Sequence, residues 1–168
     1  GLPVSSEYSA DALASTLVRD FASRQVVVLR SSQSLAEVRE WAGSQAPSSA
    51  HNGFPVVDDL NQLLGVVTRK EIDRCELAPE SSIGALISRP PIAVWEDNSI
   101  REAIDLMVRE GVGRLPVLRR GSQNEVVGIL TRSDLLAAYG SRLTESHHRE
   151  RTLRLGPEGF GKIPAGDQ

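Results

Sequence analysis

The 168-residue sequence predicts an α/β (α+β) fold of two β-α-β-β-α modules packed as a pseudo-two-fold pair. The main observation is a repeated pattern at residues 65–71 and 128–134: a glycine, two β-forming residues, Thr-Arg, a variable residue and an acid. A Pro-Val pair precedes each copy of the pattern, at Pro55 and at Pro116. A unit of about 60 residues that occurs twice indicates an internal duplication and not a longer repeat array.

Each copy is predicted to begin with a short helical turn that is followed by a β-rich run. These segments are residues 18–21 and 26–28 in the first copy, and residues 83–86 and 91–93 in the second. Apolar residues at helical spacing over residues 9–21 predict a helix that leads into the first module.

A helix follows in each copy, and the pattern Ser-x-x-Glu marks its start. Ser34 with Glu37, and Ser99 with Glu102, are predicted capping boxes. In a capping box the serine oxygen accepts from the third helical N–H, and the glutamate reaches back to the N-cap. Apolar residues at helical spacing give each helix one apolar face, and Gly111 is well placed to end the second helix.

A hairpin and a final helix complete each copy. The predicted hairpin strands are residues 54–57 and 63–67 in the first copy, and residues 115–118 and 126–130 in the second. The second final helix is expected at about residues 133–139. One copy of about 60 residues has a size at which surface burial gives only marginal stability. We therefore expect the two copies to pack sheet to sheet and to share one core.

These elements divide the chain into five parts. We predict an N-terminal linker helix at 1–17, module 1 at 18–76, an inter-module linker at 77–80, module 2 at 81–140, and a C-terminal helix and tail at 141–168. The tail is rich in glycine and proline towards its end, a composition that predicts partial disorder.

Composition excludes several classes of function. The net charge of −3 gives no basic field, so no nucleic-acid partner is expected. The single cysteine, Cys75, excludes an internal disulfide and suits a reducing compartment. The sequence has no apolar run long enough for a membrane span. It also shows no nucleophile–base pair and no metal-ligand spacing, so we expect neither an enzyme nor a metal site.

The duplicated order of elements, with a Gly-Thr-acid pattern closing each copy, resembles the tandem CBS domain over about residues 18–139. The resemblance implies a regulatory module that binds an adenine nucleotide between its two halves. ATP, ADP or AMP is then the expected regulatory ligand, no cofactor is obligatory, and a homodimer is the expected assembly.

A narrower resemblance is carried by Asn-Gly-Phe-Pro-Val-Val at residues 52–57 and Glu-Ser-His-His-Arg-Glu-Arg at residues 145–151. Both segments are similar to the cytoplasmic C-terminal region of CLC-family chloride channels and transporters. This resemblance implies a membrane domain upstream of Gly1, which the helix at 9–21 would join to the CBS pair. The module would then lie on the cytoplasmic face of the membrane and modulate chloride transport.

The resemblance also implies a nucleotide site that joins the end of the second copy to the start of the first. By position, Asp134 accepts the ribose hydroxyls, Thr131 donates to a phosphate, and Arg132 supplies charge. The partners from the first copy, beside the base edge and around the purine, are Gln25, Val26, Val27, His51, Asn52, Phe54 and Pro55. His51 stands where chloride-channel relatives often carry an aromatic residue that stacks on adenine.

A second, weaker site follows from the same duplication. It comprises Thr68, Glu71, Ile92, Arg114 and Pro116, with Pro91 beside them. Glu71 replaces the usual aspartate, and its extra methylene moves the carboxylate by more than about 1 Å, which spoils a bidentate contact. We therefore expect one nucleotide at most.

Simpler roles remain open for these residues. Thr68 and Thr131 also suit helix N-capping alone, and the two acids also suit the first turn of a helix. His51 also suits an ordinary loop. The alternative function is a nucleotide-independent dimerisation or docking module of a membrane or metabolic protein.

Overall fold

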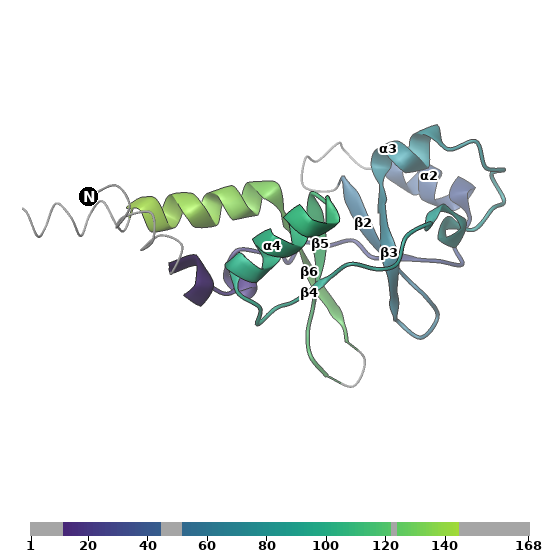
Figure 1. Cartoon of the computed structure of the whole chain (residues 1–168). Helices are drawn as coiled ribbons and strands as arrows, with labels where there is room; N and C mark the ends of the chain where they lie inside the picture. The colour runs from purple at the N-terminus through teal and green to yellow at the C-terminus, as the bar shows by residue number, and fades with distance from the viewer. Residues whose placement is uncertain (1–11, 45–51, 122–123, 145–168) are drawn as a thin grey trace, which may run out of the picture.

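The computed structural model contains two three-stranded sheets, each with its own helices packed against it (Figure 1). The structure describes residues 12–44, 52–121 and 124–144. The predicted α/β class and the pair of modules are confirmed. The predictions for residues 1–11, for His51 and for the tail from residue 145 onward lie outside the described residues.

Module 1 has the strand order β1-β2-β3. Its β1 pairs parallel with β2, and β2 pairs antiparallel with β3. Its elements are β1 (Leu29–Arg30), α2 (Leu35–Ser44), β2 (Gly53–Val57), β3 (Leu63–Thr68) and α3 (Arg69–Arg74). Both predicted hairpin strands of this copy are therefore present.

Module 2 repeats this topology with the strand order β4-β5-β6. Its elements are β4 (Val94–Trp95), α4 (Ile100–Glu110), β5 (Arg114–Leu118), β6 (Val126–Thr131) and a helix over residues 132–144. The register shifts near the end of the hairpin in both modules, at Val56/Val57 and at Val117/Leu118. The duplication therefore extends to the β-bulge, and the last helix is longer than predicted.

The predicted helix signals are confirmed. The amide of Glu102 donates to Ser99 Oγ at 3.1 Å, and the amide of Ser99 donates to Glu102 Oε2 at 3.0 Å. Ser34 and Glu37 make the same pair of bonds at 3.2 and 3.0 Å. Gly111 ends α4 with φ +65°, a left-handed conformation that glycine adopts at low cost.

The predicted β-rich runs are shorter than expected. Residues 26–28 and 91–93 form no strand, and only the next residues pair with the sheet, as β1 and β4. The chain crosses from one module to the other in these runs. It reaches the neighbouring strand only at Leu29, which pairs with Val56, and at Val94, which pairs with Val117.

The predicted helix at 9–21 is interrupted. Of its described residues, 12–15 are helical, Leu17 forms a β-bridge with Ser99, and Val18–Asp20 form the short 3-10 helix η1. Backbone hydrogen bonds to module 2 replace those of a continuous helix. The amide of Val18 donates to Asn98 O at 2.8 Å, and the amide of Ile100 donates to Thr16 O at 2.8 Å.

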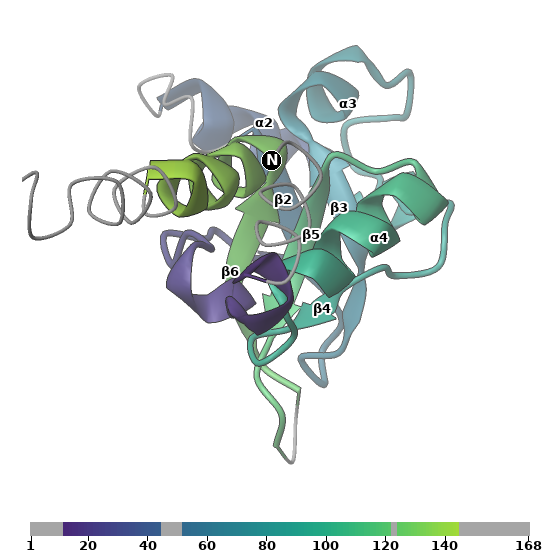
Figure 2. The ribbon, with the colours of Figure 1, turned by 60° about the vertical axis from the view of Figure 1, so that its left-hand side comes forward.

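The two leading turns are exchanged between the modules. Val18 of η1 is fully buried in the core of module 2, in one cluster with Ile100 and Leu115. Ile83, in the 3-10 helix η2 (Ile83–Leu86), is fully buried in the core of module 1. Figure 2 shows the N-terminal segment beside β4 and β6, two strands that lie far from it in the sequence. The turn that leads into module 1 thus completes the core of module 2, and the turn that leads into module 2 completes the core of module 1.

The buried side chains form two clusters. One groups Leu29, Phe54 and Ile72 around η2, and the other groups Ile100 and Leu130 around η1. The expectation of a single core shared between the sheets is therefore wrong. Since each sheet is covered by its own helices and one exchanged turn, it buries its apolar face without the other sheet.

The repeated glycine of the closing pattern makes room for the crossing segments. Ser23 and Ile129 exchange two backbone hydrogen bonds of 2.9 and 3.0 Å. A Cβ at Gly128 would lie only 2.6 Å from Ser23 O. At the equivalent Gly65, a Cβ would lie 3.0 Å from a side-chain atom of Ile87. The glycines are needed because a strand and a crossing segment meet there.

Gly128→Ala should therefore lower the free energy of unfolding by about 1–3 kcal/mol, because the added methyl pushes Ser23 off β6. Gly43→Ala is the matched control, since Gly43 lies on α2 and a Cβ there would have no neighbouring atom within 4 Å. That change should raise the free energy of unfolding by up to about 1 kcal/mol. Urea denaturation measures both, and equal effects of the two substitutions would contradict the crossing contact.

Candidate functional site: a cleft between the two modules

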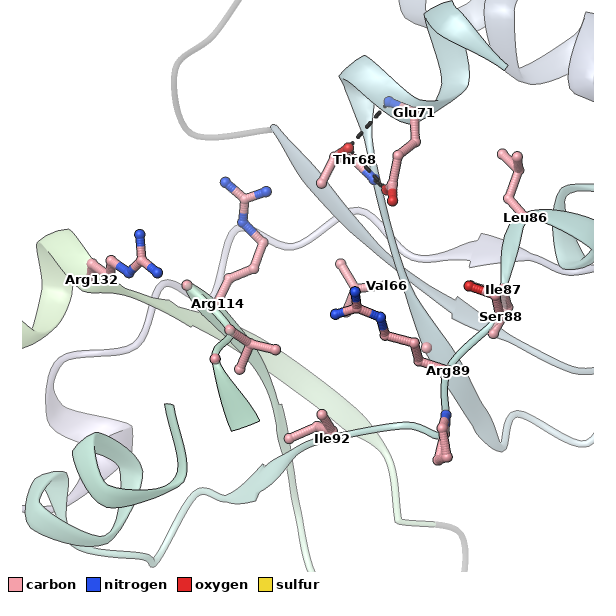
Figure 3. A pocket seen from close by; sticks show the side chains of 15 residues that line it. Val66, Thr68, Glu71, Leu86, Ile87, Ser88, Arg89, Ile92, Arg114 and Arg132 are labelled. Atoms are coloured by element: carbon pink, nitrogen blue, oxygen red, sulfur yellow. Dashed lines mark hydrogen bonds between the residues drawn. The ribbon is translucent and has the colours of Figure 1, made fainter. Parts of the chain in front are cut away.

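A cleft of about 520 Å³ opens between the modules (Figure 3). Its walls come from β3 and α3 of module 1, from the connector after η2, and from the loop and strand that follow α4. The lining residues are Gly65, Val66, Thr68, Glu71, Leu86, Ile87, Ser88, Arg89, Pro90, Ile92, Gly111, Val112, Gly113, Arg114 and Arg132. A volume of this size suits a small organic ligand.

The charged groups of the cleft are three arginines and one carboxylate. Arg89, Arg114 and Arg132 approach it from the connector, from β5 and from the start of the last helix. Within the described part of the chain, none of the three forms an ion pair with a carboxylate. Guanidinium groups bind phosphate and carboxylate through paired N–H donors, so the cleft suits an anionic ligand.

Two glycines leave room for two of these arginine side chains. A Cβ at Gly53 would overlap the Cδ of Arg114 and would lie 2.9 Å from its Nε. A Cβ at Gly113 would lie 3.1 Å from the Cζ of Arg132. Each arginine therefore rests on a bare stretch of backbone, and in the case of Arg114 that backbone belongs to the other module.

Thr68 and Glu71 form a capping box at the start of α3. The amide of Thr68 donates to Glu71 Oε2 at 2.7 Å, and its hydroxyl donates to the same oxygen at 2.9 Å. The amide of Glu71 donates back to Thr68 Oγ1 at 3.2 Å. The other carboxylate oxygen, Oε1, accepts no hydrogen bond from the described residues, so Glu71 has one oxygen for a ligand.

The apolar part of the lining consists of half-buried aliphatic side chains. Val66, Leu86, Ile87, Ile92 and Val112 contribute it. Aliphatic walls of this kind pack against flat apolar rings, while polar groups fix the orientation of a ligand. The cleft therefore combines a surface for a ring with donors for an anion.

Most of the residues predicted for the weaker site line this cleft. Thr68, Glu71, Ile92 and Arg114 are lining residues, whereas Pro116 is buried within β5 and is not one. Pro91 is exposed and adjoins the lining residue Pro90. Arg132, which the sequence grouped with the other site, also lines this cleft.

The other predicted residues do not line this cleft. Asp134 and Thr131 repeat the capping geometry: the amide and the hydroxyl of Thr131 donate to Asp134 Oδ2 at 2.8 and 3.1 Å. Phe54 has no exposed surface and its ring packs on that of Trp41, with the centroids 5.6 Å apart. The remaining described members of that set are exposed at Gln25 and Asn52, half-buried at Val26 and Val27, and buried at Pro55.

Sequence reasoning missed Arg89 and Val66 as lining residues. A signal for Arg89 existed in the repeat. Ser-Arg occurs at residues 23–24 and again at 88–89, with the same separation as the capping serines Ser34 and Ser99. The alignment of the two copies, which runs back to residues 18–21 and 83–86, contains this pair and so places the arginine in the duplicated unit.

Comparison with known proteins identifies the family. The sequence profile of the CBS domain matches residues 42–77 and 83–141, more than half of the chain. The chain belongs to the CBS domain family. The tandem arrangement predicted from the two closing patterns is thereby confirmed.

Several solved CBS structures are similar to this one. The CBS domain of a bacterial CNNM/CorC-family Mg²⁺ transporter in complex with ATP has a TM-score of 0.64 at 18% identity, over 83% of this chain and 98% of that one. CBSX2 in complex with AMP has a TM-score of 0.59 at 26% identity, over 75% of this chain and 97% of that one. A CBS pair with 5-methylthioadenosine and S-adenosyl-L-methionine has a TM-score of 0.60 at 24% identity, over 76% and 98%.

The first curated relatives are longer proteins. An uncharacterized protein of Methanocaldococcus jannaschii is 30% identical over 105 residues, which are 61% of this chain and 36% of the relative. The inosine-5′-monophosphate dehydrogenase of the same organism is 29% identical over 85 residues, 51% of this chain and 16% of the enzyme. The chain thus spans about a third or less of the length of the first curated relatives it matches. None of the helices in the described ranges is both long and apolar enough to cross a bilayer.

The capping role of Thr68 gives a direct stability prediction. Thr68→Ala should lower the free energy of unfolding by about 1 kcal/mol, because the amide of Glu71 loses its acceptor. Thr68→Ser keeps the hydroxyl and should stay within about 0.5 kcal/mol of the parent chain. Urea denaturation of the three proteins measures this, and an unchanged Thr68→Ala variant would show that the cap contributes nothing.

Proposed function

We propose that this CBS pair is a regulatory module that binds an adenine nucleotide in the cleft between Thr68 and Arg114. The observation that carries the proposal is that one cleft is lined by unpaired arginines, by a carboxylate with one oxygen left for a ligand, and by aliphatic side chains. The similar solved structures that hold AMP, ATP or S-adenosyl-L-methionine support it.

Each part of a nucleotide has a matching group in the cleft. The adenine ring would pack against the aliphatic wall at Ile92 and Val112. A ribose hydroxyl would donate to Oε1 of Glu71, the oxygen that the helix cap leaves over. The phosphate would accept hydrogen bonds from Arg114, with Arg89 and Arg132 nearby.

Only Oε1 of Glu71 is left to accept from a ligand, since Oε2 already accepts two hydrogen bonds from Thr68. The sequence-based objection to this site assumed that a ribose needs a bidentate carboxylate. A single charged hydrogen bond still contributes roughly 1.5–3 kcal/mol, so the arginines need not supply all of the affinity.

A ligand in this cleft would regulate through the relative orientation of the modules. Thr68 and Glu71 belong to module 1, whereas Arg114 and Arg132 belong to module 2. A nucleotide that contacts both groups binds best when they lie at one separation. It therefore favours the orientation of the pair that provides this separation.

The site centred on Asp134 stays a second proposal for the same ligand. Its capping geometry matches that of Thr68 and Glu71, and it includes His51, which lies outside the described residues. The docking module without a nucleotide also stays an alternative, and the titration below separates all three possibilities.

The membrane partner, too, remains a proposal. A chloride channel or transporter rests on the sequence segments 52–57 and 145–151 alone. The similar structures include the cytosolic domain of the Mg²⁺ channel MgtE in complex with ATP, with a TM-score of 0.63 at 23% identity over 76% of this chain and 51% of that one. A regulatory role beside an ion-transport domain is consistent with both. Dimerisation likewise stays a prediction.

Isothermal titration with AMP, ADP and ATP tests the proposal. The parent chain should bind at least one of them, and Arg114→Gln should weaken that binding at least about tenfold, since a charged hydrogen bond of roughly 1.5 kcal/mol or more is lost. Asp134→Asn retains an acceptor for the helix cap and should leave the affinity within about twofold.

Two results would change the assignment. Loss of affinity in Asp134→Asn with no loss in Arg114→Gln would move the ligand to the other predicted site. Absence of heat with all three nucleotides at millimolar concentration would favour the docking module.

A further inference from the structure

A second hollow of about 500 Å³ adjoins the proposed nucleotide cleft. Thr68 and Arg114 line both and therefore stand at the boundary between them. The hollow is lined by Asn52, Thr68, Arg69, Lys70, Asp73, Arg74 and Arg114. We call its four cationic residues, Arg69, Lys70, Arg74 and Arg114, the basic shelf.

The hollow has an excess of positive charge, because Asp73 is the one carboxylate that lines it beside the four cations of the basic shelf. Lys70 and Arg74 are exposed and lie four residues apart on α3, so their side chains share one face of the helix. Neither forms an ion pair with any carboxylate of the described ranges. Both charges are therefore available to a ligand.

Arg69 differs from these two residues because its guanidinium is already held. It donates to Ala42 O at 3.1 Å, and its Cζ lies 5.8 Å from the centroid of the Phe54 ring. Its positive charge is thus fixed beside the hollow and adds to the positive electrostatic potential there. Arg132 occupies the equivalent place in the second copy of the pattern, but it lines the nucleotide cleft.

Arg114 stands at the junction of the cleft and the shelf. It is half-buried at the start of β5 and packs over Gly53 of β2, where a side chain would displace it. A phosphate bound by Arg114 would therefore lie at the boundary with the hollow that Lys70 and Arg74 line. In Figure 3 the Arg114 guanidinium extends from β5 towards the end of β3 that carries Thr68.

We infer that the basic shelf takes the β- and γ-phosphates of a nucleoside triphosphate whose base and ribose occupy the cleft, so that this chain prefers ATP over AMP. The inference rests on the proposed function, since it assigns the phosphate chain of the same ligand. A monophosphate ends at Arg114 and leaves Lys70 and Arg74 unused. A triphosphate places several further negative charges beside them, and each added contact is charge-assisted.

Titration calorimetry with AMP, ADP and ATP, without divalent cations so that the phosphates keep their charge, tests this inference. The parent chain should bind ATP about tenfold or more tightly than AMP, with ADP between them. The double substitution Lys70→Gln and Arg74→Gln should bind AMP as the parent does. Its ATP affinity should fall to nearly the AMP value.

The matched control is the double substitution Arg19→Gln and Arg101→Gln. It removes the same net charge from exposed positions in η1 and α4, outside the cleft and the shelf. This variant should keep the parent's preference for ATP. An equal loss of preference in the control would show a general effect of net charge and overturn the inference.

The remaining outcomes separate the inference from the function on which it rests. Equal affinities of the parent chain for AMP and ATP overturn the basic shelf and leave nucleotide binding intact. Unchanged ATP preference in the shelf variant also overturns it. No binding of any of the three nucleotides overturns the proposed function itself.

Discussion

The exchange of the two leading turns is the constraint on which the rest of the structure depends. Val18 fills the core of module 2 and Ile83 fills the core of module 1, both without exposed surface. Because each turn is anchored in the opposite core, the chain must cross between the modules twice. Removing either segment would leave a cavity in a core of small size, where the loss of one large aliphatic side chain costs about 2–5 kcal/mol.

The second crossing builds the candidate site. After η2 the connector runs past Gly65 of β3, and it brings Arg89 and Ile92 into the cleft before β4 begins. Thr68 and Glu71 face it from module 1, while Arg114 and Arg132 come from module 2 and rest on Gly53 and Gly113. The crossing that follows the exchanged turn η2 thus helps to gather unpaired cations from both modules around one cavity.

Sequence reasoning succeeded where the signal was local and failed where tertiary contacts decided. The capping boxes at Ser34 and Ser99, the left-handed Gly111 and both hairpins follow from patterns within a few residues. The break in the first helix depends on hydrogen bonds from Thr16 and Val18 to module 2, which no local pattern records. Side-chain length also could not decide which of Glu71 and Asp134 is the better ligand group, since each uses one carboxylate oxygen in an equivalent helix cap.

The most direct test of the exchange uses the two tryptophans of the chain, one in each module. Trp41 lies on α2 against Phe54, and Trp95 lies on β4 beneath Arg120. Urea unfolding followed by fluorescence in Trp95→Phe reports module 1, and in Trp41→Phe it reports module 2. If the core of each module contains the leading turn of the other module, the two variants should unfold in coincident single transitions. Two separate midpoints, with one module unfolding while the other stays folded, would contradict the account.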